Sequence, residues 1–368
     1  MNRPGLAVCN NWRMPRDRRF DVARGLLITS VVFGHLLEKT GGWDQDGTRF
    51  ILTVLYAFHM PAFSFLTGVT AKADRLALRV ARLLSLLVLF QLLFAGLDLA
   101  LGLQPGAWFE PIWVLWYLAA MVWWQLTVPL IRRFPRTLLL VAVVIAPAAG
   151  ALDVDGNVLA YARAAAFFPF FVLGNAWGSQ LLGALGRVPP AVRLALPVAF
   201  LGAAASVYAI HGDPHWLFAN WGYARLGVDV LGGASGRAAL VLIAALGTAA
   251  FLVWVPARSP AIEKPGRHSL AVFIWHAAFV TIFAVALPAG VLEWPLWTRL
   301  TGDAALTVIL VTAFSVSAFE RSVRLVAGVP DRARQLTRIC RRGAAGDRPG
   351  SAEAVEVPQD DPLAQGPG

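Results

Sequence analysis

The sequence predicts an all-α, polytopic membrane protein: a helical bundle of about ten transmembrane helices with both termini in the cytoplasm. Of its 368 residues, 57% are hydrophobic and only 15% are charged, and the mean hydropathy is +0.61. A soluble domain carries about 25% charged residues, so this chain has too few charges to cover a water-exposed surface. Apolar stretches of near-membrane-spanning length also recur along the chain, with short charged connections between them.

We expect membrane spans at 20–38, 50–71, 78–101, 111–131, 137–152, 164–185, 191–210, 236–256, 269–290 and 303–320. If the N-terminus is cytoplasmic, 26 of the 32 Lys and Arg residues fall on the inner side of the membrane. The six on the outer side are Lys39, Arg49, Arg163, Arg225, Arg237 and Arg299. This inside bias explains the net charge of +10 by membrane orientation, and no nucleic-acid partner is expected.

Three regions follow from this arrangement. Residues 1–19 are expected to form a basic cytoplasmic leader that stays as an anchor, because the helix after it carries ionisable residues and no small-residue cleavage site. Residues 20–320 form one membrane domain. Residues 321–368 are expected to be a basic and then disordered cytoplasmic tail, since the composition after about residue 340 shifts to Gly, Pro, Ala and acidic residues.

The first span, FDVARGLLITSVVFGHLLE, carries ionisable residues in an otherwise apolar segment, and such residues are functional candidates. Arg24 and His35 are eleven residues apart. That spacing is three helical turns plus about 20°, so both share one face and lie about 16 Å apart along it. A long anionic molecule could follow this line from the cytoplasmic boundary. Alternatively, Arg24 snorkels to the interface and His35 bonds a neighbouring carbonyl.

The second and third spans add two further features. His59 lies beside Pro61 within the membrane, where the proline frees backbone carbonyls. His59 is therefore a candidate either for chemistry or for a bond to a freed carbonyl that shapes the pocket. A basic stripe with spacings of three and four then opens the third span, and it suits either phosphate groups or ordinary positive-inside topology. It consists of Lys72, Arg75, Arg79 and Arg82.

Five segments in order along the chain resemble the integral-membrane acyltransferase-3 family, and within it the fucose 4-O-acetylase-like branch. They are FDVARGLLITSVVFGHLLE, YAFHMPAFSFLTG, LWYLAAMVWW at 115–124, FFPFFVLGNAWG at 167–178 and GRHSLAVFIWH at 266–276. The most specific element is Arg24 followed after ten residues by His35, and Arg79 and Arg82 match an Arg-x-x-Arg element. His276, in the last segment, is expected to pack or to shape the pocket.

The resemblance implies a membrane enzyme that transfers an acyl group, usually acetyl from acetyl-CoA at the cytoplasmic side, to a hydroxyl of a sugar or glycan. Such a hydroxyl needs a base, and neutral His35 could serve as one. Glu38, one turn further on, either orients the imidazole, contacts the substrate or is simply solvated. The phosphates of acetyl-CoA, or of another short acyl-CoA, would bind Arg24 and the stripe residues Arg75, Arg79 and Arg82. Direct transfer is favoured over an acyl-histidine intermediate.

The acceptor is expected to approach from the outer side, where the segment HGDPHWLFANWGYARLGVD offers Trp216, Asn220 and Trp221. These side chains suit a sugar, although an interfacial aromatic belt would look the same. His211 and His215 are four residues apart, but Pro214 makes a helix there doubtful and no third ligand is apparent, so no metal is expected.

Two other functions remain open at this point. A proton-coupled secondary transporter of an organic anion would also carry intramembrane Arg and His, although no internal repeat is evident. An acyltransferase that acts on a cytoplasmic small molecule, such as a glycosylated natural product, would show the same motifs. In each case the protein is expected to be a multi-pass component of a bacterial-type inner or plasma membrane.

Overall fold

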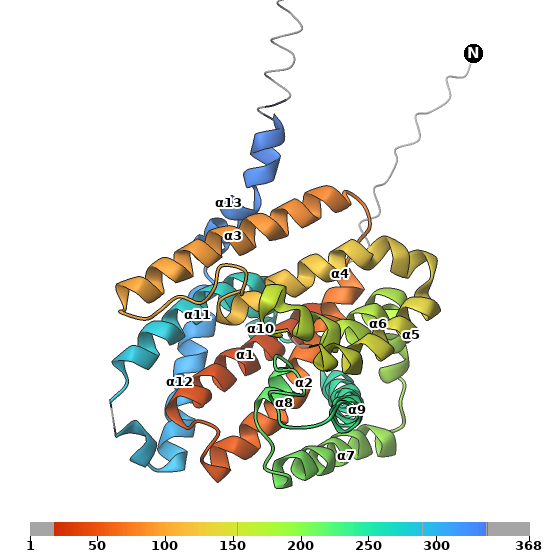
Figure 1. The fold of residues 1–368 in the computed structure, drawn as a ribbon, viewed down its shortest axis with the longest axis vertical. Coiled ribbons are helices and arrows are strands. Elements are labelled where there is room, and N and C mark those ends of the chain that lie inside the picture. Colours follow the sequence, from red (N-terminus) through yellow and green to blue (C-terminus); the bar gives the residue numbers. More distant parts are fainter. Residues whose placement is uncertain (1–17, 153, 289, 336, 338–368) are drawn as a thin grey trace, which may run out of the picture.

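The computed structural model describes residues 18–152, 154–288, 290–335 and 337, and every regular element within these ranges is a helix (Figure 1). The all-α bundle predicted from the sequence is therefore confirmed. Most of the expected leader, and the expected tail beyond residue 337, lie outside the described residues. The 3₁₀ turns are η1 (Trp113–Leu115), η2 (Ala149–Ala151), η3 (Val158–Ala160) and η4 (Val291–Glu293). The α-helices are α1 (Arg18–Thr40), α2 (Asp46–Thr70), α3 (Leu76–Ala100), α4 (Trp116–Arg133), α5 (Pro135–Ala148), α6 (Tyr161–Leu185), α7 (Pro190–Ala209), α8 (His215–Phe218), α9 (Val230–Trp254), α10 (Pro260–Arg267), α11 (Ser269–Ala286), α12 (Leu296–Phe314) and α13 (Ser317–Ala327).

The ten expected spans all correspond to helices, but fewer of them are long enough to cross a membrane. Within the described ranges, eight helices have the length and apolar composition of a span. A ninth arises if α12 and α13, which are bent by 60° relative to each other, count as one span. The segment expected at 137–152 is a shorter apolar helix, Pro135–Ala151. Hydropathy located each segment, but it indicates neither the bend between α12 and α13 nor the short length of the helix at Pro135–Ala151.

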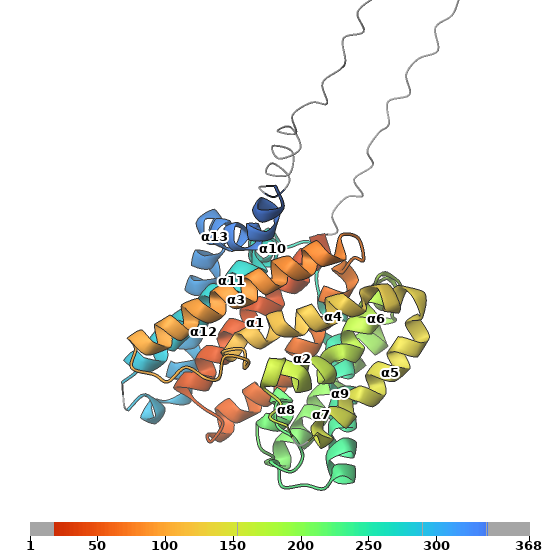
Figure 2. The ribbon, with the colours of Figure 1, turned by 45° about the horizontal axis from the view of Figure 1, so that its top comes forward.

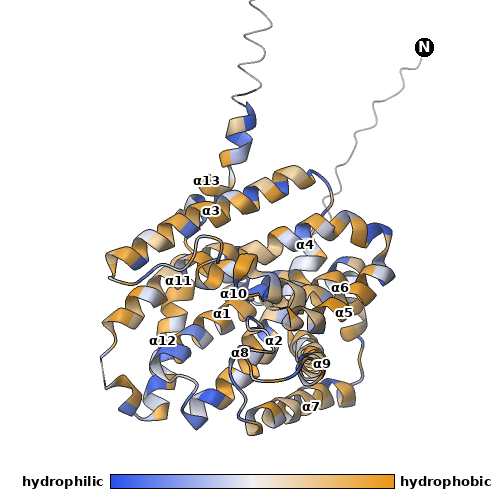
Figure 3. Cartoon of the chain, in the orientation of Figure 1, coloured by the Kyte–Doolittle hydropathy of each residue, from blue (hydrophilic) through white to orange (hydrophobic). Residues whose placement is uncertain are grey.

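Apolar residues are frequent along α3, α5 and α7 (Figure 3), and many of them are exposed. Leu92 is 52% exposed, Leu140 is 69% exposed and Leu194 is 64% exposed. Exposed apolar surface of this extent is unfavourable in water, whereas lipid chains accommodate it. Together with the spans, this surface identifies a multi-pass membrane protein.

Helices α2 and α6 meet at backbone contact through two glycines. A Cβ atom at Gly68 would lie 2.1 Å from the carbonyl oxygen of Phe171, and one at Gly174 would lie 2.0 Å from the carbonyl oxygen of Phe65. Small residues allow membrane helices to approach this closely, and close packing rather than the hydrophobic effect drives their association in lipid. The two glycines therefore fix the distance between the helices that carry His59 and Arg163.

The bundle has two distinct ends. At one end, α10 packs on the start of α1 so closely that a Cβ atom at Gly266 would lie 1.7 Å from the carbonyl oxygen of Asp21. Nε2 of His268 lies 2.5 Å from a carboxylate oxygen of Glu320, which brings α13 to the same end. The short helix α8 lies at the opposite end (Figure 2). In the orientation predicted from the basic residues, α10 and α13 face the cytoplasm and α8 faces outward.

Candidate active site

A cavity of about 230 Å³ opens between α1, α2, α6 and the η1–α4 junction, next to α8. Its walls combine aromatic rings, among them Trp113 and Trp116, with a small number of polar groups. Concave sites of this composition are the usual places for small-molecule binding. The polar lining residues are His35, Glu38, Tyr56, His59, Arg163, His215 and Asn220.

His35 is bonded to a second histidine from the far end of the chain. Its Nδ1 lies 3.1 Å from Nε2 of His276, and both side chains are buried. Nδ1 of His276 lies 2.9 Å from the carbonyl oxygen of Val272, one turn earlier in α11. The sequence suggested only a packing or pocket-shaping role for His276, but the structure brings it into hydrogen-bond contact with His35.

This chain of bonds fixes the protons on both rings. A carbonyl oxygen can only accept, so a neutral His276 carries its proton on Nδ1 and presents Nε2 as an acceptor. Nδ1 of His35 must then donate to it. The proton of a neutral His35 is thereby held on Nδ1, and its Nε2 keeps a lone pair with no hydrogen-bond partner among the described residues. A ring arranged in this way can accept a proton at Nε2.

Glu38 also lines the cavity, but other groups hold it. One of its oxygens accepts from the Tyr56 hydroxyl at 2.8 Å, and the other accepts from Nε1 of Trp43 at 3.4 Å. No hydrogen bond joins Glu38 to His35 in the described part of the chain. Of the three possibilities considered for Glu38, the geometry gives no support to orientation of the imidazole.

His59 lines the same cavity from α2. Its Nδ1 donates to the carbonyl oxygen of Leu55 at 2.5 Å, and its ring meets the edge of Tyr56 with centroids 4.9 Å apart. Pro61 frees the carbonyl of Ala57, four residues before it, so the carbonyl that holds His59 is not the one released by the proline. No hydrogen bond links His59 to His35 within the described ranges.

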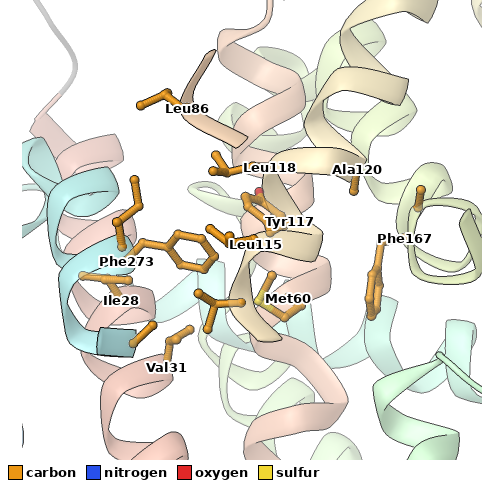
Figure 4. Close-up of a cluster of buried hydrophobic side chains, with 14 of the residues drawn as sticks. Ile28, Val31, Met60, Leu86, Leu115, Tyr117, Leu118, Ala120, Phe167 and Phe273 are labelled. Carbon is orange, nitrogen blue, oxygen red and sulfur yellow. The ribbon is translucent and has the colours of Figure 1, made fainter. Parts of the chain in front are cut away.

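Part of the cavity wall belongs to a cluster of buried apolar side chains, which Figure 4 shows. Val31, Met60 and Phe273 line the cavity and belong to the buried cluster beneath it. Tyr117 packs against Phe273 with ring centroids 5.7 Å apart. We call Val31, Met60, Tyr117 and Phe273 the apolar floor.

Arg24 lies on the far side of this floor, although it shares α1 with His35. Its guanidinium donates to the Thr70 hydroxyl at 2.7 Å, near the end of α2. One turn earlier, the Thr67 hydroxyl lies 2.7 Å from the Tyr117 hydroxyl. The path expected along α1 is therefore polar at its inner end, apolar in the middle and polar again at His35.

The basic stripe is held by carboxylates. Arg79 bonds the side chain of Asp74 at 3.0 Å, and Arg82 bonds both carboxylate oxygens of Asp331 at 2.9 and 3.1 Å. These hydrogen bonds lower the pKa of Asp74 and the pKa of Asp331, so both acids stay ionised at neutral pH. Arg75 is exposed, with a φ of 52° just before α3. The sequence located the arginines but gave no indication of their acidic partners.

The outer aromatic residues divide between the cavity and its surroundings. Asn220 lines the cavity, whereas Trp216 lines two neighbouring hollows. Trp221 stacks on His215, itself a lining residue, with ring centroids 3.4 Å apart. Nδ1 of His215 lies 2.5 Å from Asp213, and no group of three side chains suited to a metal ion occurs among the described residues.

The sequence gave no reason to single out two lining residues. Arg163 entered only as one of six basic residues on the outer side, and Tyr56 only as a letter within the second segment. The available signal for Arg163 was a positive charge within an apolar span on the side where positive charges are rare. Tyr56 carried no comparable signal, because tyrosine is common near membrane interfaces.

Comparison with known proteins supplies the class of chemistry. The family described as "Acyltransferase domain", acyltransferase-3, matches residues 17–316, which is most of the chain. A stretch of 66 residues is 38% identical to the Nodulation protein NolL of Mesorhizobium japonicum, and it covers 17% of this chain and 18% of that protein. No solved structure matches the chain. With a family match of this length on a bundle of membrane helices, the chain is a multi-pass membrane protein that belongs to the acyltransferase-3 family.

Proposed function

We propose that the protein is an O-acyltransferase that moves an acyl group, foremost acetyl, from acyl-CoA at the cytoplasmic side to a hydroxyl of a sugar or glycan. The observation that carries the proposal is the His35–His276 pair. It leaves Nε2 of His35 as an open proton acceptor on the wall of a polar cavity.

The reaction uses this nitrogen twice. As the acceptor hydroxyl adds to the thioester carbonyl carbon, its proton passes to Nε2 of His35, and the carbonyl electron pair moves to oxygen. When the tetrahedral intermediate collapses, the C–S bond breaks and the thiolate of CoA takes the proton from the imidazolium. Nε2 of His276 accepts a hydrogen bond from Nδ1 of His35 throughout and favours the charged ring. Transfer is direct, with His35 as base rather than nucleophile.

The donor is assigned to the end of the bundle that carries Arg24 and the basic stripe. CoA is anionic at its phosphates and reactive at its thioester, so arginines at the inner end and a histidine deeper in the membrane match its two ends. Arg79 and Arg82 are bonded to Asp74 and Asp331, both near the surface. Such exposed ion pairs contribute only about 0–1 kcal/mol, so phosphate groups can displace the carboxylates.

The acceptor is assigned to the cavity beside α8. Aromatic faces and hydrogen-bonding groups that include Glu38 and Asn220 suit the alternating apolar and hydroxyl faces of a sugar. Trp221 supports this wall through its stack on His215, and Trp216 borders it. The sugar preference and the fucose 4-O-acetylase-like branch rest on the sequence motifs. We place the enzyme in a bacterial-type inner or plasma membrane, with the acceptor entering from the outer side.

The proposal is tested with detergent-purified protein, radiolabelled acetyl-CoA and a panel of glycans. The wild type is expected to label a glycan, and His35→Ala to lower the rate about 100- to 10,000-fold. Arg24→Ala is expected to weaken acetyl-CoA binding about tenfold or more. His211→Ala is the matched control, because His211 is an exposed histidine bonded to the Ala209 carbonyl, outside the cavity.

Two results would contradict the proposal. A wild-type protein that binds no acyl-CoA would remove the donor, and proton-driven uptake of an organic anion into vesicles would then favour a transporter. Full transfer activity in a folded His35→Ala variant would leave the enzyme class intact but would remove His35 as the base.

A further inference from the structure

Arg163, on α6, carries a charge in the cavity that the protein itself does not pair. It is the only Lys or Arg among the described residues that line this cavity. Its Nε is buried without a hydrogen-bond partner, and no ion pair within 4 Å involves its guanidinium in the described ranges. Its contact is with the face of Trp116, where the guanidinium carbon lies 5.1 Å from the ring centroid.

Arg299 and Arg237, the buried arginines of the described ranges, each have at least one hydrogen-bond acceptor, although some of their nitrogens are also unpartnered. Arg299 donates to the carbonyl oxygen of Thr40 at 3.1 Å and to Gln45, and Arg237 donates to the carbonyl oxygen of Trp221 at 3.3 Å. A guanidinium inside a membrane is costly and is normally paired or hydrogen-bonded. The nearby carboxylate of Glu38 is instead held by Tyr56 and Trp43. The unpaired guanidinium is thus available to an anion that enters or forms in the cavity.

We propose that Arg163 binds the oxyanion that forms when the acceptor hydroxyl adds to the thioester carbonyl. This inference rests on the proposed function and assigns the group that stabilises its transition state. The new C–O bond converts the carbonyl oxygen to an alkoxide, which carries the negative charge until the C–S bond breaks. Arg163 and His35 line the same cavity, so the cation and the base can act on one bound molecule.

The largely helical walls favour a side chain for this task. Enzymes with loop-built sites use backbone N–H groups as oxyanion donors, but helix-interior N–H groups are already consumed by intrahelical hydrogen bonds. Two other polar donors in the cavity are engaged, since the Tyr56 hydroxyl bonds Glu38 and the Asn220 amide faces Asn157 at 3.3 Å. Arg163 remains with a free donor and a full positive charge.

The guanidinium is also held in place before the reaction begins. Its stacking partner Trp116 packs against Phe167 and Tyr117, each with ring centroids 5.6 Å apart. A donor that is fixed in advance stabilises developing charge far more than the same donor in water, because no reorganisation is needed.

The test compares Arg163→Met and Arg163→Lys with wild type in steady-state transfer assays. Arg163→Met is expected to lower kcat about 100- to 1,000-fold, as the loss of an oxyanion donor does elsewhere, while the KM values for acetyl-CoA and glycan stay within about threefold. Arg163→Lys keeps the charge and is expected to recover part of the rate. Arg49→Gln is the control, because Arg49 is an outer arginine bonded to the Gly212 carbonyl and lies outside this cavity.

Thermal melting and acetyl-CoA binding identify variants that remain folded. An unchanged kcat in folded Arg163→Met overturns the assignment. So does a rise in the glycan KM with kcat unchanged, which would instead make Arg163 a site for a negative group on the acceptor. If the folded wild-type protein transfers no acyl group, the proposed function fails and this inference fails with it. If transfer depends on His35 but not on Arg163, only this inference is overturned.

Discussion

Replacing His276 with phenylalanine should slow acyl transfer without removing the base. The ring keeps its approximate volume, but Nδ1 of His35 loses the acceptor that lies 3.1 Å away in a buried site. A hydrogen bond to a charged group contributes about 1.5–3 kcal/mol, and this bond strengthens when His35 becomes an imidazolium. At about 1.4 kcal/mol for each factor of ten, kcat should fall about 10- to 150-fold.

A second substitution separates hydrogen bonding from packing. The amide oxygen of His276→Gln lies near the former position of Nε2 and can still accept from His35, so this variant should keep most of the rate. Initial rates with saturating acetyl-CoA and glycan give kcat, and thermal melting confirms that both variants fold. Equal kcat values for wild type and folded His276→Phe, alongside an inactive His35→Ala, would refute the view that His276 fixes the proton on His35.

Three further predictions concern other parts of the bundle. Gly68→Ala should destabilise the protein by about 1–3 kcal/mol through overpacking, whereas Gly96→Ala, where a new Cβ meets no atom within 4 Å, should leave the melting temperature unchanged or raised. Asp331→Asn should tighten acetyl-CoA binding by up to about fivefold, because the substitution removes the carboxylate that holds Arg82. Titration measures this affinity, and weaker binding would argue against a phosphate role for Arg82. His59→Gln should keep kcat within about threefold and lower the melting temperature, and a hundredfold loss would restore His59 as a catalytic candidate.

The parts of the fold that depend on local sequence were predictable. Hydropathy located every apolar helix, since burial in lipid acts on each segment separately. Helical periodicity likewise placed Arg24 and His35 on one helix. The bend after Phe314 and the early end of α5 were missed, because packing between helices determines both features and leaves composition unchanged.

The site was only partly predictable for the same reason. His35 and Glu38 could be selected from one helix, but the partner of His35 is His276, 241 residues further along the chain. The basic stripe was visible as a spacing, whereas the link from Arg82 to Asp331 joins residues 249 positions apart. Contacts of this range depend on the tertiary arrangement, which no local pattern in a single sequence encodes.

The apolar floor also bears on how a cell could tolerate such an enzyme. A water-filled passage between the basic end and the outer cavity would let protons and ions leak down their gradients. Hydrocarbon side chains such as Met60 and Phe273 exclude them, because moving a charge into an apolar membrane interior costs about 2.5–3.5 kcal/mol or more. On the proposed route, the pantetheine arm and thioester of the donor would displace the side chains of the apolar floor and fill the opening between them. Each turnover would then carry an acyl group past the apolar floor without dissipating the ion gradients across the membrane.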